Sequence, residues 1–276
     1  MAALFALLSA AFYGVGDFCG GIASRRARAT AVVLWSHVVG LGLVVVSLPI
    51  VEGDLRGDDL AFGAIGGVAG VVGVVLLYQA LAIGPMSIVA PVTGLLAAAV
   101  PVAAGLAEGD RPSVATGIGM VLALAAIALV SAEGGGSLRP SEPRAVVLAL
   151  GAGLGFGLFF VALSYTADGA GMWPLLGARC ASVGLLGGLA LVRQVDHVVP
   201  SGTRLLAAVA GALDIAANLL YLLAVRRGLL SVVSVLTALY PVSTVVLARI
   251  VLGERFLNVQ RVGMGLALVA TILLST

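Results

Sequence analysis

The sequence predicts an all-α polytopic membrane protein whose ten transmembrane helices form two inverted five-helix repeats. Three observations support this fold class. Hydrophobic residues make up 61% of the 276 residues and charged residues 10%, compared with roughly 25% charged residues in soluble domains. Apolar runs of membrane-spanning length recur along the chain, and a long segment near its end repeats one from its middle. We therefore expect a lipid bilayer, rather than water, to surround most of the protein surface.

Ten apolar runs each approach the ~20 residues that a helix needs to cross a hydrocarbon core of ~30 Å. Only helices and closed barrels satisfy the backbone in lipid, and the strict alternation of a barrel strand is absent from the sequence. The first run lacks the basic start of a signal peptide, so we expect it to be retained. The predicted helices lie near residues 3–22, 31–50, 61–83, 86–106, 113–131, 145–166, 172–192, 204–225, 229–249 and 258–275.

The internal repeat sets the predicted organisation of the chain. Residues 84–131 and 228–275 share 17 of 48 residues without a gap, and a repeat of this length indicates a duplicated structural unit. The polar stretch 132–144, rich in glycine and proline, is the predicted linker between a first repeat, 1–131, and a second repeat, 145–276. Because five helices are an odd number, the second repeat enters the membrane from the opposite face, which gives an inverted repeat.

Glycines and prolines inside the runs predict how the helices meet. Glycines four positions apart let helix backbones approach closely in lipid. A proline within a helix removes a backbone donor, so we expect kinks that free carbonyl groups toward a cavity. The glycine pairs are Gly16 with Gly20, Gly63 with Gly67, Gly66 with Gly70, Gly151 with Gly155, and Gly184 with Gly188, and the prolines are Pro91, Pro101, Pro174 and Pro241.

Stretches at the ends of the third and ninth runs carry a family likeness. Residues 78–91 read YQALAIGPMSIVAP, residues 239–241 read LYP, and residues 252–255 read LGER ahead of Gly263. At these positions the chain resembles the ten-helix carriers of the drug/metabolite transporter superfamily, of the EamA type. The likeness extends over the whole chain in helix number and repeat length.

The resemblance implies a secondary active transporter that exports small metabolites by alternating access. It also implies a multi-pass protein of the cell inner (plasma) membrane. Two residues of the first half depart from the family pattern, Ala97 in place of a proline and Asp110 in place of a glutamate. These departures make the two halves unequal.

Ionisable residues inside the predicted spans mark the candidate site. A charge at mid-bilayer costs ~3 kcal/mol or more and persists mainly where it faces a cavity or a partner. Asp214, Asn218 and Tyr221 are spaced four and three apart, so they form one polar stripe along the eighth span. The candidate substrate-binding or coupling residues are Asp17, His37, Tyr78, Arg179, Asp214, Asn218 and Tyr221.

Two interpretations of these residues stay open from the sequence. In the first, a central pocket uses Arg179 to bind an anionic group of a small-molecule substrate and Asp214 or Asp17 to bind a cation or proton. His37 would suit a proton relay, because an imidazole can change its charge near neutral pH. In the second, the same groups pair internally, Asp17 with His37 or Arg179 with Asp214, and hold helices together.

Several function classes lack their sequence signals. Lysine is absent and no GxxxxGK[ST] loop occurs, so ATP hydrolysis within the chain is excluded and we expect an ion gradient, of protons, to drive transport. We expect no cofactor, no metal and no nucleic-acid partner, and we interpret Cys19 and Cys180 as free buried thiols. An intramembrane lipid-modifying enzyme would need clustered carboxylates or histidines. A non-transporting membrane subunit that binds a partner protein would lack convergent polar residues at mid-membrane. Substrate identity and oligomeric state stay open.

Membrane orientation receives two opposite predictions. Arginines concentrate in the odd-numbered connections, so the positive-inside rule places both termini outside the cell. The family resemblance implies that both termini lie in the cytoplasm, and we take this as the working orientation. The odd-numbered connections carry Arg25, Arg26, Arg28, Arg139, Arg144, Arg193, Arg204, Arg249, Arg255 and Arg261, and the even-numbered ones carry Arg56, Arg111, Arg226 and Arg227.

Overall fold

The computed structural model describes residues 1–84, 86–130, 143–193, 198–252 and 258–274, and within these ranges all regular secondary structure is helical. Seven of the helices are long and apolar enough to cross a membrane, and the all-α membrane fold predicted from the sequence is confirmed. Most of the predicted linker, 132–144, and residues 253–257, which hold most of the LGER stretch, lie outside the described residues. The helices are α1 (Ala2–Ser24), α2 (Ala29–Ser47), α3 (Gly57–Ile83), α4 (Met86–Glu108), α5 (Val114–Val130), α6 (Pro143–Ser164), α7 (Trp173–Arg193), α8 (Ser201–Val225), α9 (Leu230–Thr237), α10 (Tyr240–Leu252) and α11 (Asn258–Leu274).

The ninth predicted span is divided into α9 and α10. Pro241 has no N–H and its ring conflicts with the carbonyl four residues earlier, and the regular α-helical ladder is interrupted after Thr237. The chain tightens at this point, where the Leu239 N–H donates to the Leu236 carbonyl at 3.2 Å. The equivalent residue of the first repeat, Ala97, leaves α4 continuous. Pro174 lies in the first turn of α7, where a missing donor costs nothing, so the kink expected there is absent.

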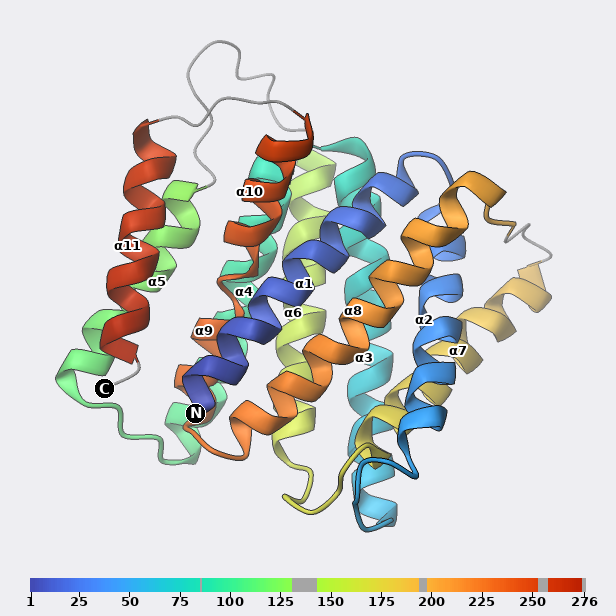
Figure 1. The fold of residues 1–276 in the computed structure, drawn as a ribbon, viewed down its shortest axis with the longest axis horizontal. Coiled ribbons are helices and arrows are strands. Elements are labelled where there is room, and N and C mark those ends of the chain that lie inside the picture. The colour runs from blue at the N-terminus through green and yellow to red at the C-terminus, as the bar shows by residue number, and fades with distance from the viewer. Residues whose placement is uncertain (85, 131–142, 194–197, 253–257, 275–276) are drawn as a thin grey trace.

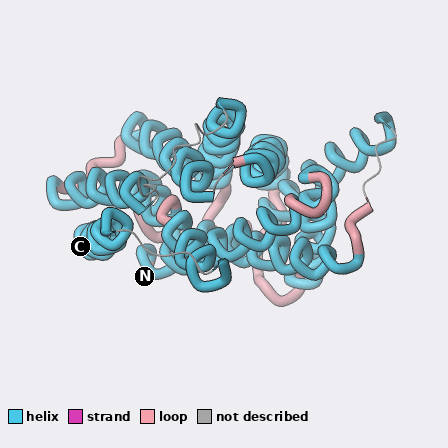
Figure 2. The backbone as a smooth tube through the Cα atoms, turned by 90° about the horizontal axis from the view of Figure 1, so that it is seen from above, coloured by secondary structure: helices cyan, strands magenta, loops and turns pink. Residues whose placement is uncertain are grey.

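The two halves pack as an inverted pair. Figure 1 shows α1 rising from the face that carries both termini, while α6 runs in the opposite direction. The closest helix pairs match when the halves are exchanged: α1 packs on α8 as α6 packs on α3, and α2 packs on α8 as α7 packs on α3. The pairs α2 with α7, α4 with α9 and α5 with α11 map onto themselves. Seen from above, the bundle is elongated and the chain ends lie near one another (Figure 2).

Glycines make the closest contacts between the halves. At Gly67 of α3 a Cβ atom would lie 2.5 Å from Cα of Ala178 in α7, and at Gly211 of α8 it would lie 2.9 Å from Cα of Ser36 in α2. Gly67 and Gly211 are 144 residues apart, the offset of the sequence repeat. Both helix pairs therefore depend on a residue without a side chain, as small-residue packing in lipid requires.

One predicted glycine pair does not pack in this way. A Cβ atom at Gly184 or Gly188 of α7 would have no atom within 4 Å among the described residues. This pair lies on an outward face of α7, so the packing role expected for it is wrong for the single chain. Nearby, Cys180 is exposed and free, and Cys19 is partly buried and free, so the prediction of two buried thiols is also wrong for Cys180.

Candidate functional site

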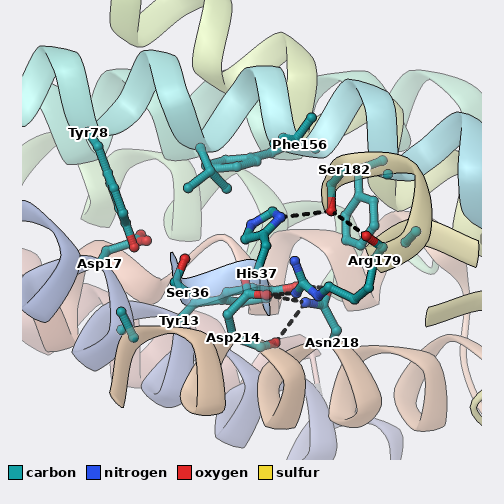
Figure 3. Close-up of a pocket in the computed structure, with 18 of the residues that line it drawn as sticks. Tyr13, Asp17, Ser36, His37, Tyr78, Phe156, Arg179, Ser182, Asp214 and Asn218 are labelled. Atoms are coloured by element: carbon teal, nitrogen blue, oxygen red, sulfur yellow. Dashed lines mark hydrogen bonds and ion pairs between the residues drawn. The ribbon is translucent and has the colours of Figure 1, made fainter. Parts of the chain in front are cut away.

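A pocket lies between the halves, lined by α1, α2, α3, α6, α7, α8 and α10. Tyr221, one of the seven residues selected from the sequence, does not line this pocket. The space left between the lining side chains is about 50 Å³, which is room for a few water molecules, since one water needs ~10–15 Å³. Six of the seven residues selected from the sequence line this pocket: Asp17, His37, Tyr78, Arg179, Asp214 and Asn218 (Figure 3).

An ion pair between Arg179 and Asp214 is the centre of a polar network. Nη2 of Arg179 donates to Oδ2 of Asp214, and the two side chains are 8% and 24% exposed. Asn218, one turn along α8, donates from Nδ2 to the same oxygen at 2.9 Å. The Tyr13 hydroxyl donates to Oδ1 of Asn218 at 2.7 Å, which joins α1 to the network. In this conformation Arg179 is neutralised by an internal partner.

His37 is held by a serine of the opposite half. Its Nδ1 lies 2.9 Å from Oγ of Ser182, and that hydroxyl donates its one proton to the Arg179 carbonyl at 3.1 Å. With that donation, the serine oxygen is left as the acceptor, and Nδ1 is assigned the proton. His37 does not pair with Asp17, so that half of the internal-pairing interpretation is not realised in this structure.

Asp17 is the pocket carboxylate without a partner. Within the described part of the chain, its carboxylate makes no hydrogen bond and no ion pair. Its neighbour in Figure 3 is the hydroxyl end of Tyr78, which reaches across from α3. Gly20 makes room for Tyr78, since a Cβ atom there would lie 2.5 Å from Cε2 of the ring. The acidic group that the pocket leaves unpaired is thus the Asp17 carboxyl.

Aromatic rings form much of the remaining wall, and sequence analysis missed most of them. The protein has only eight Phe and five Tyr, but the fold gathers several of them at the pocket from α1, α3, α6 and α10. The signal that could have found part of this set is the triplet on α6, which follows the close-packed Gly155. The lining aromatics are Tyr13, Tyr78, Phe156, Phe159, Phe160 and Tyr240.

Tyr221 lies behind the pocket rather than in it. Its ring stacks on Phe160 with centroids 4.4 Å apart, and its hydroxyl donates to the Phe160 carbonyl at 3.2 Å. The side chain is completely buried. The polar stripe of α8 therefore turns away from the pocket after Asn218, and Tyr221 positions an aromatic wall residue.

No group of three metal-binding side chains occurs among the residues with described positions. The pocket offers one ion pair, one unpaired carboxylate, one imidazole and aromatic walls. Such a set can bind a polar or charged small molecule between two halves that pack as an inverted pair. Fold and pocket together define a polytopic membrane carrier.

Comparison with known proteins identifies the family. The EamA-like transporter family, of the drug/metabolite transporter superfamily, matches residues 1–132 and 143–276, and the chain belongs to this family of membrane transporters for small molecules. A crystal structure described only as that of a protein has 17% sequence identity and a TM-score of 0.73, covering 99% of this chain and 95% of its own. That likeness supports the fold alone. A comparison with curated proteins found no match.

Proposed function

We propose that this protein is a secondary active transporter of the cell inner membrane that exports a small metabolite in exchange for protons. The halves 1–131 and 145–276 would move against each other around the central pocket, in alternating access. The observation that carries this proposal is the unpaired carboxylate of Asp17 in the same pocket as the neutralised Arg179–Asp214 pair. The export direction rests on the family resemblance.

The charge balance of the pocket favours a cationic substrate. Arg179 and Asp214 cancel, so Asp17 supplies the remaining charge, and a substrate with a protonated amine or a quaternary ammonium would complete it. Aromatic faces attract such cations, with ~0.5–2 kcal/mol for each well-placed ring. Phe156, Phe159 and Tyr240 line the same space and offer apolar contact for the body of the molecule.

Proton coupling follows from competition at one carboxylate. An unpaired charge at membrane depth is costly, so Asp17 is favoured either with a proton or with a bound cation. Since the two cannot occupy it together, entry of a proton releases the substrate and entry of the substrate releases a proton. This exchange gives antiport without any further machinery.

The broken ninth span supports a conformational step. Tyr240 lines the pocket at the first residue of α10, directly after the break. A hinge needs only a few residues, often at the end of a helix, to absorb the change in backbone dihedral angles. The pocket has room for only a few waters in this conformation, so substrate entry requires such a movement.

The test uses purified protein in liposomes that contain a pH-sensitive dye. Choline, tyramine and glucose are added outside, and proton movement is followed. We expect choline or tyramine, but not glucose, to drive proton flux in the wild type, and Asp17→Asn to reduce that flux to background. Asp58→Asn, which removes an exposed carboxylate outside the pocket, should keep it. Normal coupled flux in Asp17→Asn would refute the role of Asp17, and substrate movement without proton flux would refute coupling.

A further inference from the structure

A second hollow lies away from the transport pocket, at the face opposite the chain termini. The end of α1, the beginnings of α2 and α6 and the end of α3 surround it. Its volume is about 380 Å³, within the ~300–1,000 Å³ range of ligand pockets. Since it is formed by the ends of membrane-spanning helices, it lies at the depth of lipid headgroups.

The charge of this hollow is entirely positive. Arg28 and Arg144 line it, and neither has a carboxylate partner among the described residues. Asp17 and Asp214 belong to the central pocket. All other carboxylates with described positions lie at the face of the protein away from this hollow, in the connections there or in the helix turns beside them. The guanidinium groups therefore have no nearby acid within the described structure.

Neutral donors complete the lining. Ser24 is 6% exposed, and its Oγ has no hydrogen-bond partner among the described residues. Thr30 lies in the first turn of α2, a helix whose N-terminus has no side-chain cap. Unpaired N–H groups and the helix dipole at such a terminus favour an anion. Gln79 supplies an amide from α3.

We propose that this hollow is a binding site for a phosphate-type oxyanion. Arg28 and Arg144 would neutralise its charge from two helices, and the Ser24 hydroxyl, together with the start of α2, would donate to its oxygens. Guanidinium groups match the geometry of phosphate oxygens. The same chemistry is offered by an anionic phospholipid headgroup and by a free phosphate-bearing molecule.

Two probes separate these sources. The full chain in an uncharged detergent is titrated with dimyristoyl-phosphatidylglycerol, with the zwitterionic phosphatidylcholine as a control, and binding is counted by native mass spectrometry. Inorganic phosphate is tested separately by thermal shift at constant ionic strength. Tight binding of phosphatidylglycerol alone identifies a lipid headgroup site, and a thermal shift with millimolar phosphate identifies a site for free anions.

Charge-matched variants locate the binding. Removing both lining arginines in Arg28→Ala/Arg144→Ala should weaken binding about thirtyfold, from roughly 1 kcal/mol for each basic residue near anionic headgroups. Arg25→Ala/Arg26→Ala removes the same amount of charge from the connection that carries Arg28, but outside the hollow, and should change affinity less than about twofold. Ser24→Ala should weaken binding several-fold with the charge unchanged. Equal losses in the two arginine double variants, or no binding of either probe to the wild type, would overturn the proposal.

Discussion

Breaking the Arg179–Asp214 pair from one side should destabilise the protein strongly. In Asp214→Leu, the Arg179 guanidinium, 8% exposed, loses its counter-charge and stays buried. Leaving one buried charge uncompensated typically costs ~3–5 kcal/mol. At ~2–4 °C per kcal/mol for a chain of roughly this size, the apparent melting temperature should fall by roughly 6–20 °C.

Replacing both partners should restore most of that loss. Arg179→Met/Asp214→Leu puts apolar side chains of similar bulk in place of the pair, a change that is often neutral or stabilising for buried ion pairs. Arg179→Met alone should be destabilised like Asp214→Leu, because it leaves an unpaired carboxylate in the pocket. The assay is the melting temperature of the four proteins in one detergent, followed by tryptophan fluorescence.

The cycle also separates structure from function. We expect the double variant to be stable but inactive in the liposome assay, since the pocket has lost its polar network. If the double variant lost as much stability as the sum of the two single variants, the two side chains would not interact in the folded protein. Full transport by the double variant would mean that the pair serves only to hold helices together.

Three further perturbations follow from the packing. Gly211→Val should force α8 away from the α2 backbone and lower the melting temperature by more than about 10 °C, which corresponds to a loss of several kcal/mol of stability. Gly188→Val, with open space around it among the described residues, should change the melting temperature by no more than about 2 °C. Tyr221→Phe should lower it by about 2–4 °C through the lost hydrogen bond to the Phe160 carbonyl, with the substrate KM unchanged in the liposome assay. Burial lowers the pKa of Arg226, whose Nε and Nη2 have no hydrogen-bond partner among the described residues. The charged form therefore costs stability at every pH below that pKa. Arg226→Met should raise the melting temperature at pH 7, and a lower melting temperature would contradict the unpaired burial of the guanidinium.

The helical framework could be predicted from the sequence because lipid leaves few alternatives. Nine of the ten apolar runs became single helices, and their ends agree with the predicted ends to within four residues. The exception is the ninth run, where Pro241 was expected to kink a helix and instead ends α9 at Thr237. A proline removes one donor in either case, and only the surrounding packing decides whether the helix resumes on the same axis.

The candidate site could be predicted where its signal lies within one helix. Asp214 and Asn218 are one turn apart, and they share a hydrogen bond across that turn in the structure. The pairing of Arg179 with Asp214 was one of two interpretations left open by the sequence, and the structure shows it. The sequence could not decide between them, because spacing along one helix says nothing about the register against another. Tyr221 shows the limit of the stripe argument, since a position three residues further along the helix already faces the packed interior.

The unequal polarity of the two repeats has a consequence for transport. Gly70 of α3 and Asp214 of α8 are 144 residues apart and both line the pocket, but only the second carries a charge. Two identical halves would give inward-facing and outward-facing states of equal free energy, because exchanging the halves exchanges the states. An ion pair on one wall alone removes this equality, so one state is favoured before any substrate binds. A substrate can then shift the balance between the two states only by as much as its affinities for them differ. The ion pair that makes the two states unequal in the empty protein also shapes the site that the substrate must recognise.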